Sequence, residues 1–170
     1  HKIQPVSPIL RPNALEFFSN SAAQTRRAGM RLGEMLRTGD LICLTGDLGS
    51  GKTTLTQGIA AGWGSPDQVS SPTFVLVNVY RKPNGTSLYH LDAYRLGGPA
   101  EADDLDLDTM LATGPMVVEW ADRIEPALPD EHLLIACRWV DDQRREMVFT
   151  AQGSRYQSLL KTFRQRVFAV

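Results

Sequence analysis

Cysteine and histidine are scarce in this chain of 170 residues, which contains two of the former and three of the latter. Cys43 and Cys137 each lie inside an apolar run, where a small buried thiol is the ordinary outcome, so neither a disulfide nor a metal pair is expected. The histidines stand at positions 1, 90 and 132, and this spacing forms no zinc-binding pattern. The residues therefore offer no support for a disulfide-stapled or zinc-stabilised fold.

Surplus charge is also lacking, because the formal net charge is −1 at pH 7. Without an overall positive field the protein is not drawn to nucleic acid or to a membrane surface, so any contact with RNA has to be local or made through a partner. No apolar run is long enough to span a bilayer, and no secretory leader is recognisable. We therefore expect a cytoplasmic protein that does not associate with membranes.

Repeats and low-complexity tracts are absent, and the composition is ordinary for a globular protein, with 42% hydrophobic and 22% charged residues. A chain of this length is expected to form one domain with a full core. We predict a loose N-terminal arm over residues 1–12, a main domain over 13–153, and a C-terminal helix over 154–170 that packs on this domain.

The most informative segment is residues 46–53, which read Gly-Asp-Leu-Gly-Ser-Gly-Lys-Thr and match the phosphate-binding pattern G-x-x-x-x-G-K-[ST]. An apolar run over 41–45 precedes it and a helix-compatible stretch over 54–61 follows it, which is the strand–loop–helix setting that this pattern requires. At average residue frequencies a match arises by chance in only about one of 30,000 positions, so a mere glycine-rich turn is a poor explanation.

Each residue type of this loop has a physical role in holding a nucleotide tail. Glycines allow consecutive backbone N–H groups to point inward at phosphate oxygens, and the positive end of the following helix adds to the attraction. The Lys52 ammonium is expected to reach the β- and γ-phosphates, and the Thr53 hydroxyl to complete the ligand shell of a Mg²⁺ ion. The predicted nucleotide-binding residues of the loop are Asp47, Leu48, Gly49, Ser50, Gly51, Lys52, Thr53 and Thr54.

A phosphate-binding loop needs a carboxylate for the metal and for the attacking water or hydroxyl, and two acids stand at the ends of apolar strands. Asp92 follows the run 88–91, and Glu119 follows the run 115–118. A buried carboxylate is costly unless it meets a cation, so strand ends next to a metal are sensible positions for both. The sequence leaves open which of the two ligates the metal and which positions the water.

Residues 70–74 invite two interpretations. They can form a switch-like segment that places Thr73 near the γ-phosphate. From residue physics alone, a Ser-Pro turn before a strand is the better interpretation. His90 lies in the run before Asp92. Its simplest interpretation is a structural histidine within a strand, with its hydrogen bonds satisfied.

Hydrophobic periodicity and turn residues predict the remaining elements. Strands are expected over 15–18, 41–45, 73–81, 86–93, 115–120, 132–140 and 145–151. Helices are expected from a cap at Ser19 or Ser21 to about Arg37, over 51–61, over 101–111, and onward from a cap at Ser154. Strands alternate with helices early and form hairpins later, which predicts a P-loop NTPase-like, three-layer α/β fold. Its sheet should be mixed and partly parallel, with antiparallel hairpin additions.

Four motifs occur in order along the chain: the loop at 46–54, Ser-Pro-Thr-Phe at 71–74, His-Leu-Asp-Ala-Tyr-Arg at 90–95 and Glu-Trp at 119–120. In this combination the chain resembles the TsaE family, bacterial ATPases needed to make threonylcarbamoyladenosine in tRNA, over about residues 15–150. The resemblance implies binding of ATP and Mg²⁺, slow ATP hydrolysis, and assembly with the threonylcarbamoyl transferase proteins. Given the net charge, we expect tRNA to be contacted only indirectly or weakly.

The resemblance also implies roles for single residues. Thr73, Asp92 and Glu119 match active-site positions of the family, and Trp120 matches a tryptophan beside the nucleotide. The catalytic residues implied are Lys52, Thr73, Asp92 and Glu119, and the metal ligands implied are Thr53, Asp92 and Glu119. His90 then lies at or near the site. Asp106 stands where the family usually has a glycine, which puts the local helix geometry in question.

Two other functions use the same loop. A small-molecule or nucleotide kinase would need an acceptor pocket and an arginine-rich lid, and Arg144-Arg145 is a poor lid because it lies at a predicted hairpin. A scaffold would hold ATP without turning it over. A GTPase is not expected, because the chain has no Asn-Lys-x-Asp element to recognise guanine. The residues identify no arginine finger, which fits a slow enzyme that a partner accelerates.

Overall fold

The computed structural model describes residues 13–69 and 77–168, which form one seven-stranded mixed sheet. In spatial order its strands are β1 (Ala14–Ser19), β7 (Arg145–Gln152), β6 (His132–Trp139), β2 (Leu41–Thr45), β5 (Met116–Glu119), β4 (Ser87–Asp92) and β3 (Val77–Arg81). The central strands β6, β2, β5 and β4 pair in parallel. β7 and β3 join them through antiparallel pairs, and β1 pairs antiparallel with β7.

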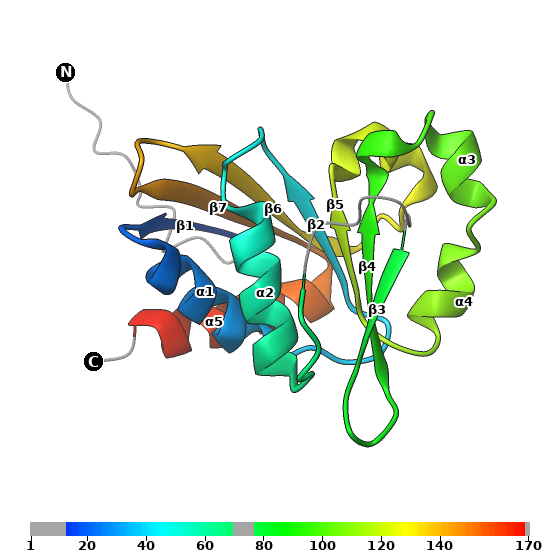
Figure 1. The fold of residues 1–170 in the computed structure, drawn as a ribbon, viewed down its shortest axis with the longest axis horizontal. Helices are drawn as coiled ribbons and strands as arrows, with labels where there is room; N and C mark the ends of the chain where they lie inside the picture. Colours follow the sequence, from blue (N-terminus) through cyan, green and yellow to red (C-terminus); the bar gives the residue numbers. More distant parts are fainter. Residues whose placement is uncertain (1–12, 70–76, 169–170) are drawn as a thin grey trace.

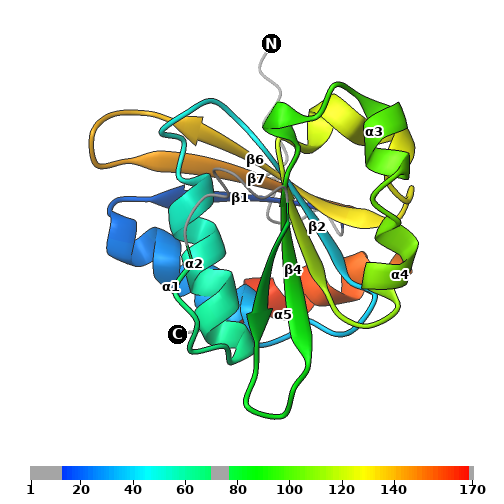
Figure 2. The same ribbon diagram turned by 45° about the vertical axis from the view of Figure 1, so that its right-hand side comes forward.

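Helices cover both faces of this sheet. α1 (Ala22–Gly33), α2 (Lys52–Trp63) and α5 (Ser154–Phe168) pack against one face. The other face carries α3 (Pro99–Asp103), α4 (Leu107–Leu111) and the short 3₁₀ segments η2 (Ala93–Arg95) and η3 (Ala121–Ala127). Figures 1 and 2 show α1 and α2 side by side, apart from α3 and α4. The predicted three-layer α/β fold is confirmed.

Two hydrophobic clusters, one on each face of the sheet, hold these layers together. β2 contributes to both because it lies in the middle: Ile42 and Leu44 belong to the cluster under α1, α2 and α5, whereas Leu41 and Cys43 belong to the other. A parallel strand buried on both faces needs a continuous apolar run, which the sequence has at this point. The loop that follows β2 is therefore anchored at the centre of the molecule.

The last helix is tied to the start of β2. Four side chains of α5 are buried on the sheet, and the Tyr156 hydroxyl accepts a hydrogen bond from the Leu41 N–H at 2.9 Å. Arg155 pairs with the Asp40 carboxylate at 2.8 Å, and this contact raises the pKa of the guanidinium.

Every helix in the described part of the chain is too short or too polar to cross a lipid bilayer.

The first helix ends earlier than predicted. α1 stops at Gly33, whereas the sequence pattern suggested about Arg37. Beyond Gly33 the backbone tightens, because the Leu36 N–H bonds to the carbonyl of Gly33 at 3.2 Å and the Arg37 N–H bonds to the Asp40 carboxylate at 2.7 Å. Leu36 is nevertheless buried, so the hydrophobic spacing continues after the helix has ended.

Two other boundaries differ or fall outside view. Ser154 was predicted to cap the last helix, but it is the first residue of α5. The residue before the helix is Gly153, whose carbonyl accepts a hydrogen bond from the Tyr156 N–H at 3.1 Å. The predicted cap is therefore off by one residue. The predicted strand 73–81 is described only from Val77, because the earlier positions lie outside the described residues.

The single helix predicted over 101–111 is wrong. The segment forms two short helices, α3 and α4, and Asp106 between them has the left-handed conformation, with φ 55° and ψ 58°. The break lets Ala102 of α3 and both Leu107 and Leu111 of α4 enter the same core cluster. A positive φ is the condition that favours glycine, the residue that the resemblance leads us to expect at this position.

Asp106→Ala should lower the free energy of unfolding by about 1–2 kcal/mol, because alanine meets the left-handed strain and also loses the bond from the Thr109 hydroxyl to the Asp106 carboxylate, 2.6 Å long. Asp106→Gly loses the same bond but relieves the strain, so it should be close to neutral. Urea denaturation of the two variants measures the difference. Equal stabilities would show that φ at this residue is not energetically important.

Candidate nucleotide-binding site

The loop between β2 and α2 is shaped by glycines with positive φ: 131° at Gly46, 79° at Gly49 and 103° at Gly51. Other residues reach these conformations only with strain. A β-carbon at Gly46 would lie 2.1 Å from the carbonyl oxygen of Cys137 in β6, so the base of the loop also packs too tightly for a side chain. The glycines give the loop the backbone conformations from which anion-binding nests of N–H groups are built.

Lys52, the first residue of α2, is buried and bends back over the loop. Its ammonium donates hydrogen bonds to the carbonyls of Gly46 and Asp47, the latter at 2.8 Å, and to the Ser50 hydroxyl at 3.3 Å. It also lies 4.4 Å from the centroid of the Trp120 ring, a cation–π contact. Burial lowers the pKa of Lys52, and the nearby Glu119 carboxylate partly opposes this effect.

The two candidate acids are direct neighbours in the sheet. β4 and β5 pair in parallel so that Asp92 is opposite Glu119, and Glu119 is in turn opposite Leu44 in β2, next to the loop. Glu119 is buried, whereas Asp92 is half-buried. One oxygen of each carboxylate already has a partner: Asp92 accepts from the Tyr94 N–H at 3.0 Å, and Glu119 contacts the ring of His90.

Trp120 ends β5 in a left-handed conformation, with φ 57°, and turns the chain away from the sheet. The predicted strand over 115–120 therefore stops one residue early at this end. The Trp120 ring contacts both the Lys52 ammonium and the Tyr94 ring, whose centroid is 5.0 Å from its own. Trp120 thus forms one wall of the space above the loop.

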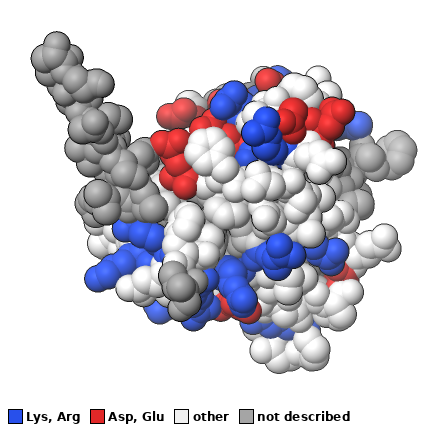
Figure 3. Space-filling model, turned by 90° about the vertical axis from the view of Figure 1, so that its left-hand side faces the viewer, with Lys and Arg blue, Asp and Glu red and all other residues white. Residues whose placement is uncertain are grey.

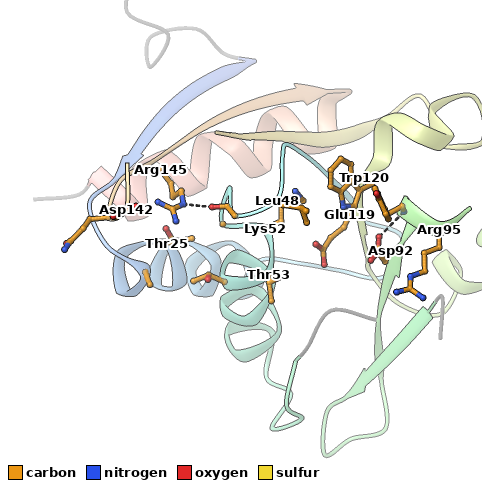
Figure 4. A pocket seen from close by; sticks show the side chains of 16 residues that line it. Thr25, Leu48, Lys52, Thr53, Asp92, Arg95, Glu119, Trp120, Asp142 and Arg145 are labelled. Atoms are coloured by element: carbon orange, nitrogen blue, oxygen red, sulfur yellow. Dashed lines mark hydrogen bonds between the residues drawn. The ribbon is translucent and has the colours of Figure 1, made fainter. Parts of the chain in front are cut away.

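These residues surround a pocket of about 470 Å³ (Figure 4). The predicted site residues that line it are Leu48, Gly49, Gly51, Lys52, Thr53, Thr54, Asp92, Glu119 and Trp120. Asp47 and Ser50 belong to the same loop without lining the pocket, and Ser50 is buried against Lys52. Thr73 lies outside the described residues.

Sequence reasoning missed one end of this pocket. Ala22 and Thr25 of α1 line it, as do Asp142, Gln143 and Arg145 of the β6–β7 hairpin. Tyr94 and Arg95 were also missed; both line the pocket, and Figure 4 shows Arg95 near Asp92, at the opposite end.

Arg145 ties the hairpin to the glycine-rich loop between β2 and α2. Its Nε donates to the Gly49 carbonyl at 2.8 Å (Figure 4). One of its terminal nitrogens donates to the Asp141 carbonyl at 2.6 Å. The neighbouring Arg144 is exposed and pairs with the Asp141 side chain instead. The hairpin position made this arginine pair unpromising from the sequence, yet β6 is next to β2 in the sheet, which brings the turn over the loop.

The oxygen donors at the pocket suit magnesium. Thr53 offers a hydroxyl, and Asp92 and Glu119 offer carboxylates. No group of three or more His, Cys, Asp or Glu residues able to hold a metal occurs within 13–69 and 77–168. Magnesium commonly takes one or two protein carboxylates and completes its shell with phosphate oxygens and water, so this donor set fits an ion that arrives with a nucleotide.

Comparisons with known proteins agree with one another. A model of the family described as threonylcarbamoyl adenosine biosynthesis protein TsaE matches residues 19–147. The tRNA threonylcarbamoyladenosine biosynthesis protein TsaE of Streptomyces coelicolor is 44% identical over 137 residues, which cover 77% of this chain and 93% of the relative. The protein of the same name from Bacillus subtilis is 44% identical over 72% of this chain and 77% of the relative.

The fold has a close counterpart among solved structures. The crystal structure of YdiB from Bacillus subtilis superposes with a TM-score of 0.75 and 34% sequence identity. The superposition covers 90% of this chain and 95% of that chain.

Proposed function

This chain belongs to the TsaE family of threonylcarbamoyl adenosine biosynthesis proteins, and on that premise we propose that it is a magnesium-dependent ATPase required for threonylcarbamoyladenosine modification of tRNA. One observation carries the proposal. The glycine-rich loop, Lys52 and Thr53 face Asp92 and Glu119, which end adjacent parallel strands, across a single pocket. Backbone N–H groups, a cation and two acids are the groups that enzymes use to transfer a phosphoryl group to water.

In this proposal, the backbone N–H groups of residues 47–53 hold the β-phosphate. The Lys52 ammonium exchanges its carbonyl partners at Gly46 and Asp47 for phosphate oxygens, a change that needs only movement of a flexible side chain. Thr53 and one of the two carboxylates, Asp92 or Glu119, would hold a magnesium ion, which would supply positive charge where negative charge develops between the β- and γ-oxygens. The carboxylate that does not ligate the metal orients the attacking water.

The nucleoside end of ATP follows from the same geometry. In Figure 4, Asp92, Glu119 and Trp120 lie on one side of Lys52 and Thr53, and Thr25, Asp142 and Arg145 lie on the other. With the γ-phosphate at the carboxylates, the ribose and base extend toward the start of α1 and the β6–β7 turn. This part of the pocket then contributes to nucleotide affinity rather than to the chemistry.

Arg145→Ala should weaken ATP binding about 10-fold, because it removes a charge-assisted hydrogen bond that holds Gly49 and a positive charge from the pocket wall. Arg144→Ala is the matched control, since this neighbouring arginine is exposed and bonds to Asp141. Isothermal titration calorimetry with a non-hydrolysable ATP analogue measures both. Equal ATP affinities in the two variants would contradict a role of Arg145 in nucleotide binding.

Slow turnover by the isolated protein and stimulation by the threonylcarbamoyl transferase proteins are part of the proposal.

On the face shown in Figure 3, lysine and arginine gather mostly in the lower half and acidic residues mostly in the upper half. With a net charge of −1, this separation supports only local or indirect contact with tRNA.

The decisive experiment measures phosphate release from ATP with and without the transferase proteins and tRNA. Strong stimulation by the partners supports an ATPase that serves their assembly. Phosphate transfer to added nucleosides, above the rate of transfer to water, would instead support the kinase alternative. Absence of any phosphate release with all partners present would leave an ATP-holding scaffold.

A further inference from the structure

A line of three polar side chains runs through the interior behind the pocket. Tyr80 lies on β3, His90 on β4 and Glu119 on β5, and their exposed fractions are 3%, 0% and 4%. Tyr80 belongs to the core cluster beneath α1 and α2, as do Leu88 and Val117, which precede His90 and Glu119 by two residues on the same strand faces. The line therefore lies between the sheet and the helix that begins with Lys52.

Hydrogen bonds join these three side chains in sequence. The Tyr80 hydroxyl lies 2.8 Å from Nδ1 of His90, and Nε2 of His90 contacts Oε2 of Glu119. An ionised carboxylate only accepts, so Nε2 is the donor toward Glu119, and in the neutral ring Nδ1 accepts from the hydroxyl. Each bond thus directs its donor toward the carboxylate that lines the nucleotide pocket.

This arrangement distinguishes Glu119 from the other acid of the pocket. Asp92 is half-buried and holds one oxygen against the backbone N–H of Tyr94, two residues on. Glu119 is buried, and its anchor is a ring that is itself immobilised, because His90 is inaccessible to solvent and bonded on both nitrogens. One oxygen of Glu119 is therefore fixed, and the orientation of the other is fixed with it.

We propose that His90, itself oriented by Tyr80, is a positioning residue that aims the second oxygen of Glu119 at the metal and the γ-phosphate. The inference rests on the proposed ATPase function and goes beyond it, since it assigns a task to two buried residues that do not line the pocket. Interactions of this kind, one step removed from the metal, commonly change metal affinity or activity about 10- to 100-fold.

Two substitutions of His90 separate the contacts of the ring. The amide of Gln reaches approximately the place of Nε2 and can still donate to Glu119, whereas the amide of Asn reaches only approximately the place of Nδ1 and keeps just the Tyr80 contact. His90→Asn should lower kcat about 10-fold or more, and His90→Gln should stay within about 3-fold of the wild type. Tyr80→Phe should show a smaller loss than His90→Asn, because the bond to Glu119 remains.

A second measurement does not depend on turnover. Adding Mg²⁺ should tighten the binding of a non-hydrolysable ATP analogue to the wild type, and His90→Asn should lose about 10-fold of that gain. Affinity in the presence of EDTA should be unchanged, because the loop and Lys52 are intact. Combined with Glu119→Ala, the His90→Asn substitution should add no further loss, since it acts through the missing carboxylate.

The outcomes are distinct. Equal effects of His90→Asn and His90→Gln, in proportion to the loss of folded protein seen by thermal unfolding, would reduce His90 to a structural role and overturn the inference. So would an additive loss in the Glu119→Ala background. If the wild type itself bound no ATP analogue with Mg²⁺, the proposed function would fail, and this inference with it. If the wild type bound the analogue normally and the His90→Asn variant were unaffected, this inference would be wrong while the proposed function would stand.

Discussion

Lys52→Ala is expected to abolish nucleotide-dependent activity, with turnover falling at least about 100-fold. The ammonium is the positive charge at the centre of the loop, in contact with the carbonyls of Gly46 and Asp47 and facing Glu119. Burial lowers its pKa, whereas phosphate groups favour its charged form, so the protonated lysine and the nucleotide strengthen each other. ATP affinity by calorimetry and phosphate release with the partner proteins both measure the effect.

Lys82→Ala is a closely matched control for this substitution. Each lysine lies 4.4 Å from the centre of a tryptophan ring, Lys52 over Trp120 and Lys82 over Trp63, but only the first lines the pocket. The control should lose at most about 1 kcal/mol of stability and no activity. Near-normal ATP turnover in Lys52→Ala would refute the assignment of the loop as the phosphate site.

Glu119→Ala is expected to damage hydrolysis more than nucleotide binding, with kcat falling about 100-fold and the affinity for ATP about 10-fold or less. The carboxylate faces the loop from the end of β5, where it can stabilise charge that develops during the reaction. Glu119→Gln keeps the size of the side chain and an oxygen toward His90, but it removes the charge and replaces the second oxygen by an NH2 group, so it tests both without leaving a cavity. Single-turnover hydrolysis and calorimetry separate the two quantities.

Asp92→Ala provides the comparison, because this acid is the direct neighbour of Glu119 in the sheet. If Asp92→Ala costs affinity in the presence of Mg²⁺ and Glu119→Ala costs turnover, Asp92 ligates the metal and Glu119 orients the water. The reverse pattern exchanges these roles. A large loss of affinity with unchanged turnover in Glu119→Ala would contradict its assignment to catalysis.

Much of the candidate site could be predicted because its signals are local. The spacing of glycines before Lys52 and Thr53, between an apolar run and a helix, determines a strand–loop–helix unit without reference to the rest of the chain. The acids at 92 and 119 were also recognisable, because each follows a run of apolar residues that has to be a buried strand. These patterns lie within single elements, where backbone periodicity and turn chemistry decide the outcome.

The errors arose where packing overrides local preference. The acidic segment from 101 to 111 has the composition of one helix, yet the core requires Ala102, Leu107 and Leu111 to face the same cluster, and the chain breaks at Asp106 to achieve this. Helix propensity is worth only a few tenths of a kcal/mol per residue, which burial of a single leucine exceeds.

The sequence by itself determined that a glycine-rich loop follows a buried strand, and that an acid ends each of two other strands. Only the tertiary structure decided that Asp92 lies opposite Glu119, that Arg145 holds the loop from a distant hairpin, and that Tyr80 and His90 stand behind the buried acid. The reason is physical: spacing along the chain fixes which face a side chain occupies, but strand order and register follow from how all the apolar faces are buried together.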